Sequence, residues 1–172
     1  MTPTQKNNIA WVLPRPKKDH YKGGMPLYAE EWLIKLANRE LGFKGKLLNL
    51  FCGMNKYGFR VDIKPDVKPD LVCDVHELTA YHNEKYDIIM ADPPYSNQEA
   101  KEIYNTPKLH YKIWSHEADK LLNIGGLFII YHKYMMPNPA PEKYRILNRV
   151  FIGTRTYHVP RVALIFRKEL EK

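Results

Sequence analysis

The sequence predicts an α/β domain with one open, mostly parallel β-sheet and an antiparallel strand near its C-terminus. Three observations lead to this prediction. The chain has 172 residues, a length that one well-buried domain commonly occupies. Short apolar runs of strand length recur along it, and two amphipathic segments with helical spacing accompany them. Buried strands flanked by helices are typical of open α/β sheets, whose ligands bind beyond the carboxyl ends of the strands.

The first 24 residues are predicted to form an irregular basic arm, followed by the folded domain over residues 25–172. The arm mixes prolines with basic side chains and ends at two glycines, a composition that disfavours regular structure. The domain is expected to begin with a helix over residues 25–41, because its apolar residues recur at steps of three and four. Gly42 is typical of a helix C-terminal stop.

After this helix, five apolar runs are expected to form strands. A second amphipathic helix is predicted over residues 109–122, between the fourth and fifth of them. Residues 147–152 and 161–167, joined by a turn-rich segment, are expected to form an antiparallel pair that closes the sheet. The five runs span residues 46–52, 59–63, 71–73, 86–91 and 127–131.

The connections after the first and second of these strands are too short for the usual crossover helix. Residues 53–58 leave room for one turn at most, and residues 64–70 contain two prolines. We therefore expect reduced crossovers and a sheet that is thinly covered on one side over half its width. Such a surface would suit a homodimer or a partner subunit.

Composition and charge narrow the class of protein. Hydrophobic residues make up 44% and charged residues 27%, as in a soluble globular protein, and no apolar run approaches the length of a membrane span. The N-terminus lacks the features of a secretory signal, so the cytoplasm is the expected location. The formal net charge of +8 favours a polyanionic partner, nucleic acid above all, although a basic surface can also serve solubility alone.

The two cysteines, Cys52 and Cys73, each lie in an apolar run. Neither has a Cys or His neighbour at metal-ligand spacing, so we expect no metal site there. Both are expected to be reduced core residues, because a disulfide would require an oxidising compartment.

Candidate ligand-binding residues follow the first three strands. Gly53 follows the first, where a glycine lets the backbone turn sharply and approach a ligand closely. Asp62 ends the second strand and is placed to accept hydrogen bonds from the two hydroxyls of a ribose. Asp74 ends the third and is placed to accept one from an adenine amino group. Taken singly, either carboxylate is more often a solvated loop residue.

The strongest signal is Asp92-Pro93-Pro94-Tyr95, directly at the carboxyl end of the fourth strand. Two successive prolines fix φ and remove two amide donors, so the loop is rigid and presents carbonyl groups. The Asp92 carboxylate and the Pro93 carbonyl could accept the two N–H bonds of an exocyclic amine, while Tyr95 offers a flat face to a ring. An isolated match of this kind is as often an ordinary Pro-Pro turn. Its position after a glycine turn and two acids favours a ligand site.

With these motifs in this order, most of residues 22–167 resembles the class I methyltransferases that use S-adenosylmethionine (SAM), in the DPPY-containing group that methylates amino nitrogens. That group consists chiefly of DNA adenine-N6 and cytosine-N4 methyltransferases. The resemblance implies a single-domain Rossmann-like sheet, here without a separate target-recognition domain, and SAM as the cofactor. It also implies that a flipped-out target base binds at Asp92-Pro93-Pro94-Tyr95.

The resemblance further implies a set of cofactor contacts. The first-strand motif would hold the methionine part of SAM, the second-strand acid the ribose and the third-strand acid the adenine. A looser match just before the first helix would cover the methionine end. The residues concerned are Asn49, Phe51, Cys52, Gly53, Asp62, Ile63, Asp74, Val75, Lys22 and Pro26.

The glycine motif departs from the family pattern at two positions. The family motif begins with an acid and ends with a glycine, whereas this chain has Asn49 and Asn55 there. Asn49 can still hydrogen-bond an ammonium group, but it offers no negative charge. We therefore expect either weaker SAM binding or help from another group.

We expect direct methyl transfer, without a metal, from SAM to an exocyclic amino nitrogen of a nucleic-acid base. Adenine N6 in DNA is favoured over RNA, with Tyr95 contacting the base and Lys17 and Lys18 of the arm contacting the substrate. Alternatives from other classes stay open: methylation of an RNA base or a protein glutamine, or a SAM-binding or nucleic-acid-binding module without catalysis. A dinucleotide-dependent oxidoreductase is disfavoured because Gly-x-Gly-x-x-Gly is absent.

Overall fold

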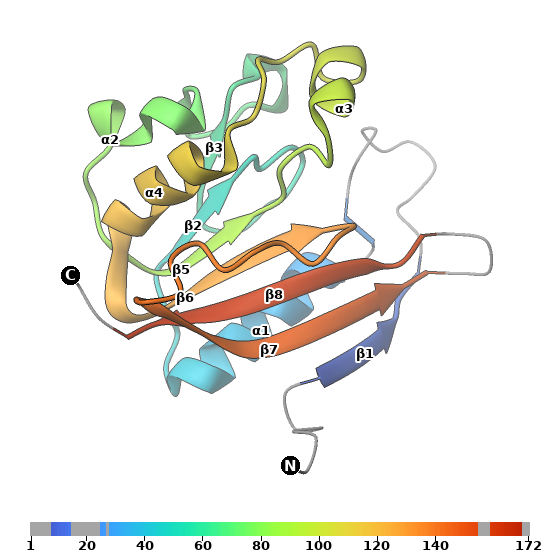
Figure 1. The fold of residues 1–172 in the computed structure, drawn as a ribbon, viewed down its shortest axis with the longest axis vertical. Coiled ribbons are helices and arrows are strands. Elements are labelled where there is room, and N and C mark those ends of the chain that lie inside the picture. The colour runs from blue at the N-terminus through green and yellow to red at the C-terminus, as the bar shows by residue number, and fades with distance from the viewer. Residues whose placement is uncertain (1–7, 15–24, 27, 155–158, 170–172) are drawn as a thin grey trace.

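One eight-stranded sheet organises the part of the chain that the computed structural model describes, which is residues 8–14, 25–26, 28–154 and 159–169 (Figure 1). The strands lie in the order β1-β7-β8-β6-β5-β2-β3-β4. Their bounds are β1 Asn8–Val12, β2 Leu47–Leu50, β3 Phe59–Asp62, β4 Leu71–Val72, β5 Tyr86–Ala91, β6 Leu122–His132, β7 Tyr144–Gly153 and β8 Arg161–Lys168. The helices are α1 Ala29–Leu41, α2 Leu78–Tyr81, α3 Asn97–Glu102 and α4 Tyr111–Leu121, with 3-10 turns at Pro65–Val67 and Val75–Glu77.

The pairing of the strands confirms the mostly parallel sheet with an antiparallel C-terminal strand. β2, β3, β4, β5 and β6 run parallel to one another, whereas β8 runs antiparallel to both β6 and β7. The strand order reverses between β2 and β5, since the chain adds β3 and β4 on one side of β2 and then returns to the other. Such a reversal leaves a crevice at the carboxyl ends of the two central strands, where ligands bind in sheets of this type.

Helices α1 and α4 lie on opposite faces of the sheet (Figure 1), and each face carries its own apolar core. On one face, α1 packs Leu33 and Leu36 against sheet residues that include Ile88. On the other face, Trp114 and Ala118 of α4 pack with the remaining inward side chains of the same strands. The long buried strands therefore read as continuous apolar runs in the sequence, because both of their faces are covered.

The connection from β2 to β3 contains no helix, as its length predicts. The chain covers the distance between these parallel strands in residues 51–58. Gly58 makes this possible, because its φ is 78° and a Cβ there would lie 2.5 Å from the carbonyl oxygen of Leu47. The next connection holds only the 3-10 turn Pro65–Val67. The expectation of reduced crossovers is confirmed, and Val72 of β4 is left half exposed.

The first strand corrects the prediction of an irregular arm at residues 8–12, whereas residues 1–7 and 15–24 of the predicted arm lie outside the described part of the chain. Asn8–Val12 forms β1, which pairs in parallel with β7 at the edge of the sheet. Ile9 and Trp11 face the α1 side, where the Trp11 ring lies edge-on to Trp32 with 5.4 Å between the centroids. Alternation at Ile9, Trp11 and Leu13 was the available signal, and the prolines and basic residues around it obscured a strand of period two.

The other elements differ from the predictions mainly at their ends. α1 begins at Ala29 rather than at residue 25, and β6 begins at Leu122 rather than at residue 127. The short helices α2 and α3 were not predicted, because four to six residues are too few for a periodic pattern. Cys52 and Cys73 are buried free thiols, and burial raises the pKa of each to about 11. None of the described helices combines the length and apolarity that crossing a bilayer requires.

Candidate active site

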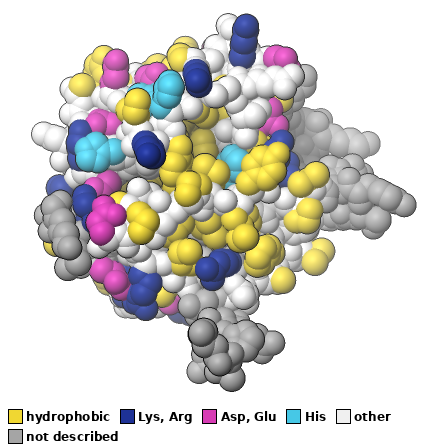
Figure 2. Space-filling view, viewed as in Figure 1, with side chains coloured by type: hydrophobic (Ala, Val, Ile, Leu, Met, Phe, Trp, Pro, Cys, Tyr) yellow, Lys and Arg dark blue, Asp and Glu magenta, His cyan; other side chains and the backbone are white. Residues whose placement is uncertain are grey.

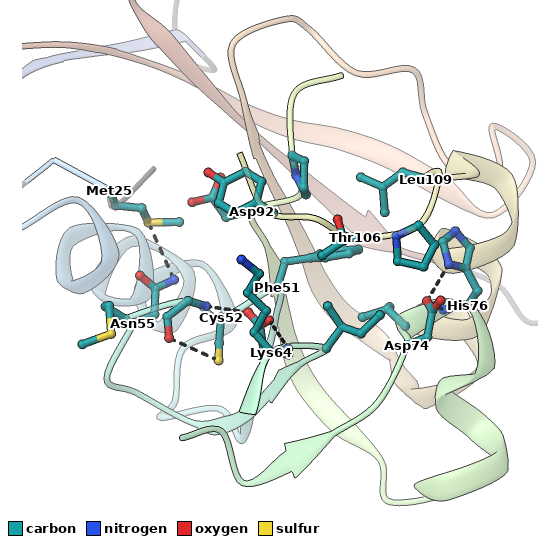
Figure 3. A pocket seen from close by; sticks show the side chains of 18 residues that line it. Met25, Phe51, Cys52, Asn55, Lys64, Asp74, His76, Asp92, Thr106 and Leu109 are labelled. Carbon is teal, nitrogen blue, oxygen red and sulfur yellow. Dashed lines mark hydrogen bonds and ion pairs between the residues drawn. The ribbon is translucent and has the colours of Figure 1, made fainter. Parts of the chain in front are cut away.

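A pocket opens at the carboxyl edge of the sheet, at the point where the strand order reverses (Figure 3). Residues that follow four successive parallel strands line it, together with the loop between α3 and α4. Of the residues predicted for the site, the pocket wall contains Phe51, Cys52, Gly53, Asp62, Ile63, Asp74, Val75, Asp92 and Pro94. The other wall residues are Met25, Met54, Asn55, Lys64, His76, Tyr104, Thr106, Pro107 and Leu109.

The loop after β2 is held to the end of β3 by Asp62. Phe51 and Gly53 both adopt positive φ, 53° and 46°, which turns the backbone sharply over the pocket. The Gly53 amide donates a hydrogen bond of 2.9 Å to Asp62 Oδ2, and the Lys64 amide donates one of the same length to Oδ1. A carboxylate has about four acceptor sites. Asp62 can therefore bind two further donors from a ligand while it fixes the loop.

Asp74 is oriented by a histidine two residues further along the chain. His76 donates to Asp74 Oδ1 from its backbone amide, over 2.9 Å, and its Nδ1 lies 2.6 Å from the same oxygen. The His110 amide donates to Nε2 of that imidazole over 2.9 Å. Because Nε2 accepts, the ring hydrogen sits on Nδ1 and points at Asp74. Figure 3 shows Asp74 and His76 at one end of the pocket and Met25 and Asn55 at the other.

Asp92 lies where the pocket meets the end of β5. Its amide donates to the Leu50 carbonyl over 3.3 Å, so the motif starts in register with the central strand β2. Burial raises the pKa of the Asp92 carboxyl well above its usual value, and the charge of Arg161 opposes that rise only in part. An acid in such surroundings favours a ligand that brings hydrogen-bond donors to it.

Tyr95 faces away from this pocket, toward β6 and β8. Its hydroxyl accepts a hydrogen bond of 2.9 Å from Arg161 Nε, and its amide donates to Glu99 over 2.9 Å. The ring lies edge-on to His132 with 4.9 Å between the centroids, and burial lowers the pKa of His132 to about 4. Tyr95 is thus a fixed neutral phenol beside a neutral imidazole, with the cations Arg161 and Lys133 near its ring.

Besides Tyr95, three of the predicted residues are described but do not line the pocket. Asn49 is fully buried beneath the loop after β2, Pro93 is buried behind Asp92, and Pro26 lies next to the wall residue Met25. Lys17, Lys18 and Lys22 lie outside the described residues.

Several wall residues escaped prediction because they come from irregular segments. His76 is recognisable only from its spacing to Asp74, and the side chains from Tyr104 to Leu109 lie in a loop without hydrophobic periodicity. Nothing local in the sequence indicates that this loop folds back over the third strand.

Beside the Asp92-Pro93-Pro94-Tyr95 motif, apolar side chains gather on the face in front of β7 and β8 (Figure 2). Tyr134 connects this face to the motif, because its ring lies 5.5 Å from that of His132, which in turn contacts Tyr95. The exposed large apolar residues of this region are Val12, Tyr134, Met135, Phe151 and Val159.

Comparison with known proteins places the fold among methyltransferases. The sequence matches no protein-family model and no curated protein. Among solved structures, TrmN from Thermus thermophilus superposes with a TM-score of 0.61 at 16% identity, over 86% of this chain and 50% of that one. The chain thus spans half the length of TrmN.

Two similar structures are close to this chain in size. The N-methyltransferase NodS from Bradyrhizobium japonicum WM9 gives a TM-score of 0.55 at 12% identity, over 82% of this chain and 94% of that one. A SAM-dependent methyltransferase from Clostridium acetobutylicum gives 0.54 at 11% identity, over 82% and 91%. The chain therefore has the Rossmann-like fold of these methyltransferases.

Proposed function

We propose that the pocket binds SAM and that the protein transfers a methyl group to an exocyclic amino nitrogen. The order of side chains along the sheet edge carries this proposal. The Gly53 loop, Asp62 and Asp74 follow three adjacent parallel strands, and Asp92 follows the fourth. The methyltransferase fold supports it independently, since NodS and the clostridial protein are described as N-methyl- and SAM-dependent methyltransferases.

The chemistry of the wall fits SAM from end to end. Asp62 retains acceptor sites for the two ribose hydroxyls while it holds the loop amides. Asp74, fixed by His76, provides an acceptor for the adenine amino group at the far end, beside the apolar side chains of Val75 and Leu109. Asn55 and Met25, at the opposite end, would then lie near the methionine part.

When bound, SAM supplies an electrophilic methyl group, and the chain positions the nitrogen that receives it. The lone pair of an exocyclic amine is delocalised into its ring, which makes the amine a poor nucleophile. Acceptors at the Asp92 carboxylate and the Pro93 carbonyl would bind its two N–H bonds and favour a pyramidal nitrogen with an exposed lone pair. The two prolines keep this acceptor pair rigid, so most of the rate enhancement would come from orientation.

We further propose that the amine belongs to a nucleic-acid base, with adenine N6 in DNA as the substrate. The net charge of +8 supports a polyanionic substrate, and Asp92-Pro93-Pro94-Tyr95 resembles the motif of amino-methylating enzymes. Tyr95 would contact the base from the side of the molecule that carries the exposed apolar face beside β8. An apolar surface next to basic side chains such as Lys133 suits an unstacked base and its phosphates.

The deciding experiment incubates the protein with methyl-labelled SAM and a panel of single- and double-stranded DNA and RNA, followed by nucleoside analysis. Labelled N6-methyladenine from DNA is the expected product. Label in RNA or in cytosine would identify a different substrate and leave the proposed methyl transfer intact.

Two variants test the chemistry itself. Asp92→Ala should bind SAM in calorimetry nearly as well as the wild type, yet lose turnover by about 10²-fold or more. Asp66→Ala, at an exposed carboxylate in the loop after β3, is the matched control and should retain both. Tight SAM binding by the wild type without methyl transfer to any polymer would instead identify a binding module without catalysis.

A further inference from the structure

A carboxylate on α1, Glu30, reaches into the loop after β2. Its Oε1 accepts a hydrogen bond of 3.1 Å from Asn49 Nδ2 and bonds of 3.0 Å from the backbone amides of Lys56 and Tyr57. Those two amides belong to the connection that has no crossover helix. In a longer connection a helix would pair these backbone amides; here a side chain from another element accepts from them.

The hydrogen bonds around Glu30 continue as a chain to the pocket wall, and each donor in this chain points toward Glu30. Because Asn49 donates its Nδ2 to Glu30, its Oδ1 is left to accept, and it accepts from Asn55 Nδ2 over 3.3 Å. Asn55 in turn uses its amide nitrogen as the donor, so its carbonyl oxygen is the acceptor that remains at the wall. Figure 3 shows Asn55 beside Met25 at this end of the pocket.

This common direction matters because each amide passes on the effect of the carboxylate. A chain of hydrogen bonds polarises its members in the same direction, so the negative charge of Glu30 strengthens the acceptor at Asn55. A ligand cation with N–H donors at that position would gain from a charge that it does not touch. Burial raises the pKa of Glu30, and the Tyr57 and Lys56 amides oppose that rise by stabilising the ionised form.

We infer that Glu30 is a positioning residue for the ammonium group of the methionine part of SAM, an inference that rests on the proposed function. It supplies from α1 the negative charge that the first-strand motif lacks at Asn49, and it holds the shortened loop in its binding shape. The two asparagines then belong together: Asn49 must donate to Glu30 and accept from Asn55, which an aspartate at position 49 could not do beside a second carboxylate.

The first test compares Glu30→Gln with Glu31→Gln. Both remove one negative charge from the first turn of α1, but Glu31 pairs with Lys35 on the exposed surface. Calorimetry should show SAM binding about tenfold weaker in Glu30→Gln and unchanged in Glu31→Gln. Turnover at saturating SAM should stay close to wild type in both, because Glu30 does not touch the methyl acceptor.

The identity of the ligand group is tested with 5′-deoxy-5′-methylthioadenosine, which has the adenosine part of SAM and no ammonium. Its affinity should be the same in the wild type and in Glu30→Gln. Equal weakening of both ligands would show that Glu30 only maintains the fold of the loop, and would overturn the inference.

A charge exchange separates the role of the charge from that of the side chain. Asn49→Asp alone should weaken SAM binding, since two adjacent carboxylates cannot both stay ionised at low cost. Glu30→Gln combined with Asn49→Asp restores one carboxylate and one amide at this contact and should recover most of the wild-type affinity. Failure of the double variant to recover, with an unchanged melting temperature, would overturn the inference.

The two proposals can fail separately. A wild-type protein that does not bind SAM contradicts the proposed function. A wild-type protein that binds SAM, with equal affinity in Glu30→Gln, contradicts only the role of Glu30. The dependence of SAM affinity on pH gives a further check, because protonation of Glu30 removes its charge. As the pH is lowered, the affinity of the wild type should begin to fall at a higher pH than the pKa of an ordinary glutamate would predict. This fall should be absent in Glu30→Gln.

Discussion

Arg161 Nε donates a hydrogen bond of 2.9 Å to the Tyr95 hydroxyl, and the guanidinium carbon lies 4.7 Å from the centroid of the Tyr95 ring. The same cation opposes the rise in the pKa of Asp92. One side chain at the start of β8 thus acts on both ends of the Asp92-Pro93-Pro94-Tyr95 motif. The antiparallel strand at the C-terminus contributes to the candidate active site as well as to the sheet.

Replacing Arg161 should therefore impair turnover more than cofactor binding. In Arg161→Met we expect turnover to fall by about 10–100-fold, because Tyr95 loses its fixed position and Asp92 becomes harder to ionise. SAM affinity, measured by calorimetry, should change little. Arg145→Met, which removes an exposed cation of β7 paired with Glu169, is the control. An Arg161 variant with wild-type turnover would show that Tyr95 needs no support.

The raised pKa of Asp92 predicts the acid limb of the pH profile. The ionised Asp92 carboxylate is a stronger hydrogen-bond acceptor than the protonated acid, so turnover should fall as the pH drops through its pKa. Because burial places this pKa well above the ordinary aspartate value of about 3.9, the limb should lie correspondingly higher. Turnover at saturating SAM, measured across the acid range, checks the position of the limb.

The raised pKa of Asp92 also predicts that removing its charge stabilises the folded protein although it abolishes activity. A carboxyl with a raised folded-state pKa favours folding in its neutral form, and this contribution is lost as the pH rises through that pKa. Asp92→Asn keeps the shape without the charge. It should unfold at a higher urea concentration than the wild type at pH 7, while its turnover collapses. Equal midpoints at pH 7 would indicate that Arg161 compensates the buried charge fully.

His76→Ala should weaken SAM binding by roughly 3–10-fold, because Asp74 loses the hydrogen bond from the imidazole and keeps only the one from the backbone amide of residue 76. Turnover at saturating SAM should remain close to wild type, since Asp74 and Asp92 lie at different parts of the pocket. His116→Ala, at an exposed position of α4, is the matched control. A loss of turnover without a loss of affinity would contradict this role.

The two glycines Gly58 and Gly42 provide a paired test of the short connection. Both have positive φ, 78° and 81°, but only at Gly58 would a Cβ meet backbone, at 2.5 Å from the Leu47 carbonyl oxygen. Gly58→Ala should lower the free energy of unfolding by about 2–4 kcal/mol, and Gly42→Ala by about 1 kcal/mol, the cost of the left-handed conformation alone. Urea unfolding measures both values. Equal losses would show that the loop moves freely away from β2.

The sequence predicted the parallel core of the sheet because its signals are local. Strands buried on both faces, such as residues 86–91, read as apolar runs, and the short connection at residues 53–58 allows a helix-free crossover only. Because the carboxyl ends of parallel strands meet at one edge, the residues that follow them could be grouped from the order of the motifs along the chain. Gly53, Asp62, Asp74 and Asp92 all line one pocket.

The tertiary structure alone decided which residues support these four. Glu30 comes from α1, His110 from the start of α4 and Arg161 from β8, and each meets its partner across the sheet edge. Such contacts have no periodicity, because they depend on where separate elements end in space. The direction of Tyr95, away from the pocket and toward Arg161, was undetermined for the same reason. Local pattern determines strands and their ends, whereas packing between distant elements determines charge and orientation at the site.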